Sequence, residues 1–128
     1  MIVVDGAAFV ERVARLDHEE WVQEQVADEL IHAPHLIDVE VANALRNLAA
    51  RKVLSAAAAR DALADFSVAR VRRYPHRFLL ERIWELRHGF SAYDASYVAL
   101  AEILDAPLVT TDLRLARSRG HRARIVAP

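Results

Sequence analysis

The sequence predicts an α/β fold, a three-layer sandwich in which a short parallel sheet is flanked by helices. Two observations support this class. Short β-branched runs alternate along the chain with longer segments whose apolar residues have helical spacing. Hydrophobic residues make up 54% of the 128 residues, with only three glycines and four prolines. We therefore expect a single domain over residues 1–128, with a substantial core and no linker.

The beginning of the chain predicts a strand followed by two helices. MIVVD (1–5) is β-branched and closed by Asp5, which is typical of a buried strand. Asp5-Gly6 would suit a hairpin turn, but AAFVERVARL (7–16) has apolar residues at helical spacing. A helix is therefore expected directly after the strand, and a second one at HEEWVQEQVADEL (18–30).

The next segments are mainly helical in pattern. IHAP (31–34) is either a short strand or the turn that enters the following helix. That helix is long, HLIDVEVANALRNLAARKV (35–53), and Pro34 is well placed at its start. SAAAARDALADFSVA (55–69) predicts a further helix, capped by Ser55.

An edge strand and two helices are expected next. RVRRYP (70–75) has the pattern of a short edge strand, which Pro75 would end. HRFLLERIWELRHG (76–89) is helical in pattern, with Gly89 past its end. The helix over 91–104 is apolar on nearly all sides, so we expect it to be buried.

The C-terminal segments complete the sheet. APLVTTD (106–112) predicts a second buried strand, LRLARSRG (113–120) a short helix, and RARIVA (122–127) a last strand. Because helices separate the strands, the strands should be parallel and covered on both faces.

Composition excludes several classes of protein. The chain has no cysteine, so disulfides and thiolate metal sites are excluded, and a reducing cytoplasm is the expected location. The N-terminus lacks the basic region of a secretory signal, and no apolar run approaches the roughly 18 residues of a membrane span. The net charge of -1 argues against binding nucleic acid through bulk charge.

Three aspartates are directed to one edge of the predicted sheet. Two predicted strands end in an aspartate, Asp5 and Asp112, and ligands of parallel sheets bind beyond the carboxyl ends of the strands. Asp94 lies in the first turn of the helix before the second of these strands. That helix must run antiparallel to the strand, which brings its N-terminus to the same edge.

A fourth acid lies on the long helix after Pro34. Glu40, Asn43 and Asn47 form one polar line among neighbours that are otherwise apolar. A polar line on a half-buried helix indicates that it faces a solvent-filled cleft. Glu40 is therefore a candidate to join the three aspartates.

Each acid also has a purely structural interpretation. Ser91 and Asp94 fit a capping box. Asp112 would suit the cap of the short helix after it, and Asp5 the close of a strand turn. Glu40 would suit a solvated position on its helix.

The four acids together favour a different interpretation. Four carboxylates in one small volume repel one another and would be protonated or displaced unless a cation holds them. Oxygen ligands without cysteine or convergent histidine select Mg²⁺ or Mn²⁺. Such a site can generate hydroxide and neutralise the charge on a phosphodiester. The residues therefore predict a metal-dependent nuclease.

Four segments also resemble a known family. They are MIVVD (1–5), APHLIDVEVANALR (33–46), SAYDASYVALAE (91–102) and APLVTTDLRLA (106–116). Together they resemble the PIN-domain family and, within it, the VapC toxins of bacterial toxin–antitoxin systems. The resemblance covers nearly the whole chain with the acids in the same order and spacing, whereas residues 50–90 match only in helical character.

The resemblance implies both an activity and its ligands. It implies an endoribonuclease that depends on Mg²⁺ or Mn²⁺ and hydrolyses RNA phosphodiester bonds. Asp5 and Asp94 would be the most direct metal ligands, and Glu40 and Asp112 would bind the metal or its water shell. Members of the family are usually homodimers and are inhibited by a cognate VapB antitoxin, whose C-terminal arm lies across the active-site groove.

One position departs from the family pattern. The second residue after the first aspartate is commonly Ser or Asn in the family, where it supports the metal shell, but here it is Ala7. Thr110 or Thr111 is the expected source of a supporting hydroxyl, and Asn43 a further supporting group. Ala7 leaves open a second interpretation, a catalytically weak or inactive PIN-like module that binds antitoxin or RNA.

The C-terminal segment is rich in arginine. After Asp112 the chain has no acid and five arginines, at Arg114, Arg117, Arg119, Arg122 and Arg124. A GC-rich genome would also produce this bias, but the planar guanidinium suits phosphate contacts. The first three are therefore our candidate RNA contacts.

Overall fold

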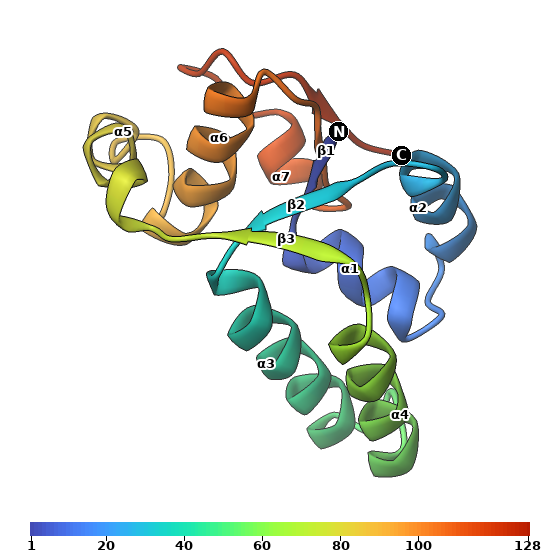
Figure 1. Cartoon of the computed structure of the whole chain (residues 1–128). Coiled ribbons are helices and arrows are strands. Elements are labelled where there is room, and N and C mark those ends of the chain that lie inside the picture. The colour runs from blue at the N-terminus through green and yellow to red at the C-terminus, as the bar shows by residue number, and fades with distance from the viewer.

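The computed structural model describes all 128 residues and contains one five-stranded sheet (Figure 1). The strands are β1 (Ile2–Val4), β2 (Ile31–Pro34), β3 (Val71–Tyr74), β4 (Leu108–Val109) and β5 (Ile125–Val126). Their order is β3-β2-β1-β4-β5, and every neighbouring pair is parallel. The predicted class, a parallel α/β sandwich, is confirmed.

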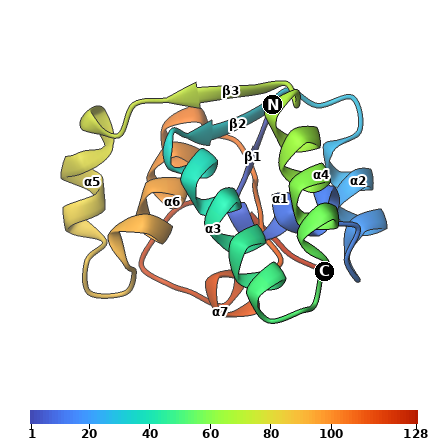
Figure 2. The ribbon, with the colours of Figure 1, turned by 90° about the horizontal axis from the view of Figure 1, so that it is seen from below.

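Helices cover the sheet in two groups. They are α1 (Gly6–Val13), α2 (Glu19–Val26), α3 (Leu36–Ala50), α4 (Ala56–Ser67), α5 (Leu80–Glu85), α6 (Ala92–Leu104) and α7 (Leu113–Ala116). Helix α6 packs on β1, β2 and β4, whereas α1 packs with α2, α3 and α4. Figure 1 shows α6 above β2 and β3 with α1, α3 and α4 below, and Figure 2 shows the lower group from beneath. None of the helices has the length and apolar composition needed to cross a bilayer.

The core lies between these layers and includes β1 and α6. All three residues of β1 are buried, and α6 is buried without interruption from Ala95 to Ala101. This confirms the expectation that α6, apolar on nearly all sides, is an internal helix. Burial of α6 against three strands fixes where its N-terminus lies relative to the sheet.

Several element boundaries differ from the predicted ones. The expected helix over 76–89 is a 3₁₀ turn (Arg77–Leu79) followed by α5, which ends at Glu85, well before Gly89. After Glu85 the chain continues in a turn, in which the Gly89 N–H donates a hydrogen bond to the Leu86 carbonyl. Helix α3 ends at Ala50, shortly before Lys52 adopts a left-handed backbone conformation that no helix can continue.

The two uncertain strands are both present. IHAP forms β2, so the strand alternative is correct, and its last residue, Pro34, precedes α3 rather than starting it. The edge position expected for RVRRYP is also confirmed, because β3 pairs only with β2. At an edge, Pro75 can end the strand without removing a hydrogen bond from a neighbour.

Shortening of single side chains on α6 tests whether burial of this helix stabilises the fold. Leu100 is completely buried, whereas Ile103 on the same helix is 53% exposed. Leu100→Ala should lower the free energy of unfolding by about 2–5 kcal/mol, because it leaves a cavity in the core. Ile103→Ala should lower it by less than about 1 kcal/mol. Urea denaturation measures both values, and equal losses would contradict the internal position of α6.

Candidate carboxylate site

The strand order creates a switch point between β1 and β4. The chain passes from β1 outward to β2 and β3, then crosses back to β4 and β5 on the other side of β1. Ligands of open parallel sheets bind at such a point, beyond the carboxyl ends of the strands. Asp5 directly follows β1, and Thr110 directly follows β4. The edge predicted from sequence is therefore the edge where the fold favours a ligand.

Asp5 is buried and held by two hydrogen bonds. Its Oδ1 accepts the Ala8 N–H at 2.8 Å, which caps α1, and its Oδ2 accepts the Thr110 hydroxyl at 2.5 Å. The Thr110 oxygen in turn accepts the Asp112 N–H at 2.9 Å. These contacts tie the ends of β1 and β4 together. Thr110 is thus the threonine that contacts an acid, whereas the Thr111 side chain makes no such hydrogen bond.

Glu40 reaches the same edge from α3 because residue 6 is glycine. Glu40 Oε1 accepts the Gly6 N–H at 3.1 Å. A β-carbon at position 6 would lie only 2.1 Å from this oxygen, so any other residue would push the carboxyl away. Sequence reasoning missed this role of Gly6. The available signal was a glycine directly after a strand-ending aspartate in a chain with three glycines.

Asp94 and Asp112 lie at helix starts. Asp112 caps α7, because its Oδ1 accepts the N–H groups of Arg114 and Leu115 at 2.9 and 3.3 Å. Ser91 caps α6 by accepting the Asp94 N–H at 3.1 Å, which leaves the Asp94 carboxylate free for other contacts. Both carboxylates pair with one nitrogen, Arg114 Nη2, at 2.7 Å from Asp94 Oδ2 and 3.1 Å from Asp112 Oδ2.

The electrostatics of the four acids are coupled. Burial raises the pKa of Asp5 to about 6, and the charges of Asp112 and Asp94 add to this effect. Burial also raises the pKa of Glu40 to about 7, with contributions from the charges of Asp5 and Asp94. Each carboxylate therefore makes ionisation of the buried pair more costly. The structure brings all four into one electrostatic environment.

Tyr97 on α6 lies beside this pair. Its hydroxyl is buried and outside hydrogen-bonding geometry with any partner. Burial raises the pKa of Tyr97, and the charges of Glu40 and Asp5 raise it further. Sequence reasoning treated Tyr97 only as part of an apolar helix face, so this polar atom near the acids is a second residue that it missed.

The carboxylate oxygens of the four acids are suitable ligands for a hard divalent cation, but in this structure they are not close enough together to coordinate one. All are oxygen atoms, and ionisation of Asp5 and Glu40 is disfavoured in a way that a nearby cation would offset. However, no group of three or more acid or histidine side chains converges closely enough to hold a metal ion. Arg114 stands between Asp94 and Asp112 instead. The chemistry of the donors fits a divalent ion, while the arrangement in this structure has Arg114 paired with two of the four acids.

The remaining candidates lie around this edge. Asn43 makes no hydrogen bond to the acids, but together with Glu40 it lines a hollow of about 380 Å³, whose other residues are Leu36, Val39 and Tyr93. Arg117 and Arg119 are exposed and make no ion pair. The polar line on α3 thus faces open space at Glu40 and Asn43.

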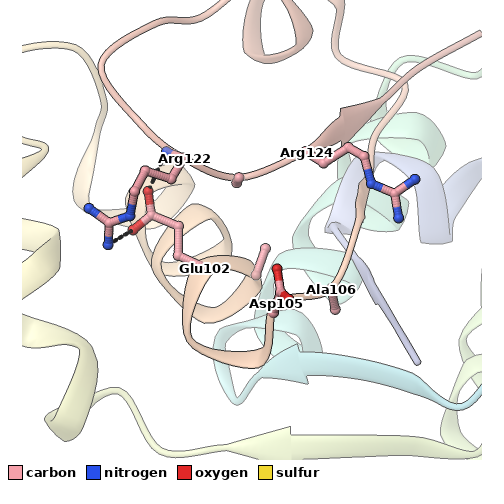
Figure 3. A pocket seen from close by; sticks show the side chains of 7 residues that line it. Glu102, Asp105, Ala106, Arg122 and Arg124 are labelled. Atoms are coloured by element: carbon pink, nitrogen blue, oxygen red, sulfur yellow. Dashed lines mark hydrogen bonds and ion pairs between the residues drawn. The ribbon is translucent and has the colours of Figure 1, made fainter.

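A further cavity, of about 240 Å³, lies at the other end of α6 (Figure 3). The Glu102 carboxylate there accepts two hydrogen bonds from Arg82, at 2.7 and 3.0 Å, and one from the Arg122 N–H at 2.7 Å. This network ties α5 and the segment before β5 to the C-terminal end of α6. This network connects elements of the fold. It is separate from the four acids, because Asp94 lies in the first turn of α6 and Glu102 lies near the end of the same helix.

Comparison with known proteins identifies the family. The PIN domain family matches residues 2–120, and this chain belongs to it. The chain is also 51% identical over 116 residues to VapC ribonuclease Mb0985 of Mycobacterium bovis, which covers 91% of this chain and 89% of that protein. Within the family, it is therefore a VapC-type PIN domain.

Solved structures agree with this fold. The crystal structure of PAE2754 from Pyrobaculum aerophilum matches with a TM-score of 0.67 and 29% identity, over 98% of this chain and 83% of that one. VapBC2 from Rickettsia felis, solved bound to a DNA fragment from the promoter, matches with a TM-score of 0.66 over 99% and 98% of the chains. At 15% identity, the second match shows the fold alone.

Replacement of Gly6 tests the contact with Glu40. Gly6→Ala should turn the Glu40 carboxyl out towards solvent, because a β-carbon would overlap it. The pKa of Glu40 should then fall from about 7 towards the ordinary glutamate value of 4.5. NMR titration of the side-chain carboxyl measures this pKa. Gly89→Ala is the control, since its β-carbon meets only ordinary contacts at 3.8 Å. A Glu40 pKa that stays near 7 would contradict the close approach.

The raised pKa of Asp5 predicts how stability depends on pH without metal. Folded Asp5 keeps its proton up to about pH 6, whereas the unfolded chain releases it near pH 3.8, so the folded state binds more protons between these values. The free energy of unfolding should therefore fall as pH rises through this window. Between pH 5 and 8 the parent should lose about 1–2 kcal/mol more than Asp5→Asn, from 1.36 kcal/mol per pKa unit. Urea denaturation in EDTA measures this difference, and parallel pH profiles would refute it.

Proposed function

We propose that this chain is a Mg²⁺- or Mn²⁺-dependent endoribonuclease of the VapC type that hydrolyses RNA phosphodiester bonds at its four carboxylates. One observation carries the proposal. Asp5 lies buried at the β1–β4 switch point with the half-buried Glu40 beside it, and the charge of Asp94 opposes the ionisation of both, as that of Asp112 does for Asp5. Arg114 pairs with Asp94 and Asp112, but no basic side chain pairs with Asp5 or Glu40, and a divalent cation would balance their charge.

The four acids have distinct roles in this proposal. Asp5 and Asp94 are the most direct ligands, and Glu40 and Asp112 bind the ion or its water shell. The bound ion supplies a water molecule of lowered pKa and neutralises charge on the phosphodiester. Thr110 keeps Asp5 in one orientation through the 2.5 Å hydrogen bond from its hydroxyl.

Other residues of this edge bind and orient the substrate. Helices α1 and α6 both begin here, so their N-terminal N–H groups place partial positive charge next to an anionic RNA backbone. Arg117 and Arg119 are exposed without partners, so both are available to phosphates. Asn43 lies beside Glu40 at the rim of the hollow and serves as a polar contact there.

Named relatives support the same activity. The protein of 51% identity is named a VapC ribonuclease, and its alignment spans most of both chains. A binding module without activity is the second candidate, favoured by the open arrangement of the acids around Arg114.

We extend the proposal to a VapB-type antitoxin as partner. The hollow beside Glu40 continues into an apolar groove, where Leu36 and Tyr93 are joined by Leu80 and Ile83. Tyr93 is 66% exposed and Leu80 56%. An amphipathic antitoxin segment would bury these side chains and block the acids at the same time. The structural neighbour from Rickettsia felis carries the paired name VapBC2.

We also propose that the chain forms a homodimer in the cytoplasm. Phe78 and Trp84 are large apolar side chains that are 48% and 67% exposed, and each is suited to a homodimer contact. We place the active protein in the cytoplasm, where an RNA substrate and an antitoxin are both accessible.

Amide substitution of the proposed ligands tests the activity. The purified chain, free of antitoxin, should cleave RNA with Mg²⁺ or Mn²⁺ and stop when EDTA is added. Asp5→Asn and Asp94→Asn should keep the circular dichroism spectrum of the parent and lose at least about a hundredfold in cleavage rate, because each removes a charged ligand. Gel-based cleavage of a labelled RNA measures these rates.

The matched control is Asp61→Asn, an exposed acid on α4 that should leave the rate unchanged. Equal rates for the parent and the two site variants would refute the assignment of the acids. A parent that binds RNA but never cleaves it would favour the inactive module.

A further inference from the structure

Arg114 makes an unusual pair of contacts for a surface arginine. It lies on α7, and one of its guanidinium nitrogens bonds to both Asp94 and Asp112. It is the only basic side chain that forms an ion pair with any of the four acids. It nevertheless remains 67% exposed, so burial does not lock it in place.

We propose that Arg114 is an internal counterion that competes with the divalent cation for Asp94 and Asp112 and, once displaced, becomes a phosphate contact for the substrate. This inference rests on the proposed function, because it assigns a role towards the same metal. It goes beyond that function by giving the chain two states, one with Arg114 between the two aspartates and one with Arg114 released.

The hydrogen bonds of Asp112 explain the competition. Its Oδ1 is already occupied by two backbone N–H groups of α7, so Oδ2 is the oxygen left for a cation. Arg114 occupies that oxygen, and it occupies Asp94 Oδ2 as well. A guanidinium and a divalent ion are both positive and repel each other at this range. Metal binding by these two aspartates therefore requires the Arg114 side chain to leave.

The backbone keeps the released side chain close to the site. The Arg114 N–H donates to Asp112 Oδ1 at 2.9 Å, so the Cα of Arg114 stays at the start of α7 whichever way its side chain points. The exposed guanidinium has open solvent in which to swing. A planar fork of donors held at the rim of the carboxylates is well placed for a phosphate oxygen.

The competition lowers the apparent metal affinity of the parent. Only the fraction of molecules with Arg114 displaced can use both aspartates, so the apparent Kd rises by the inverse of that fraction. Exposed ion pairs are weak, so the effect should be modest, about two- to tenfold. Metal binding shifts the population towards the released state. Arg114 would thus be offered to RNA mainly by the metal-loaded protein.

Calorimetric titration with Mn²⁺ alone, without RNA, tests the competition. Arg114→Gln should bind Mn²⁺ about two- to tenfold more tightly than the parent. Arg114→Lys, which keeps the charge, should lie closer to the parent. Arg117→Gln is the matched control, because Arg117 is also an exposed arginine, at the other end of α7, with no acid partner. It should change the Kd by less than about twofold.

Titration of the parent with Mg²⁺, followed by the NMR signals of the arginine Nε–H groups, tests the release. The Arg114 signal, assigned by its loss in Arg114→Gln, should shift on metal binding, and the Arg117 signal should not.

The outcomes separate the two proposals. If the parent binds Mn²⁺ and Arg114→Gln binds no more tightly, or if the Arg114 signal is unmoved, the counterion role is wrong while the metal site stands. If neither the parent nor Arg114→Gln binds the ion at millimolar concentration, the metal site itself is refuted and the inference falls with it. Binding by Arg114→Gln alone would support the competition.

Discussion

The site depends on one hydrogen bond, from the Thr110 hydroxyl to the buried Asp5 carboxylate, which joins the ends of β1 and β4. Those two strands pair in parallel and flank the switch point of the sheet, so this contact holds the Asp5 carboxylate between the two halves of the site. The next residue, Gly6, then admits Glu40 from α3 because it has no side chain. The strand-to-helix junction at Asp5 and Gly6 thus places the buried Asp5 carboxyl group next to the half-buried one of Glu40.

The structural and chemical roles of the acids coincide in this fold. Asp112 caps α7, as a purely structural interpretation of the sequence would have it, and Asp5 caps α1 rather than closing a strand turn. Each carboxylate accepts hydrogen bonds from backbone N–H groups, which hold it in one orientation. A metal ligand also requires a fixed orientation. Capping lowers the pKa of Asp5, but burial and the neighbouring acids outweigh it. The cost of ionising Asp5 and Glu40 without a nearby cation is the physical basis for assigning a divalent cation to this edge.

Topology made part of the site predictable. The edge shared by Asp5, Asp94 and Asp112 follows from strands that end in aspartate and from the antiparallel course of α6, and the structure has this arrangement. The approach of Glu40 to Gly6 was missed, because the glycine after Asp5 is visible in the sequence but the packing of α3 against α1 is not. The contacts of Arg114 depend on side-chain torsions that no spacing rule encodes. The early end of the expected helix over 76–89 could not be predicted either, because the apolar residues keep helical spacing beyond Glu85, where the helix ends.

The most direct test of the central claim is an anomalous difference map from crystals grown with Mn²⁺. The account predicts a single strong cluster of anomalous density among Asp5, Glu40, Asp94 and Asp112, with the Arg114 guanidinium moved away from the two aspartates. A map with no density at that edge at millimolar Mn²⁺, or with density only elsewhere on the molecule, would contradict it.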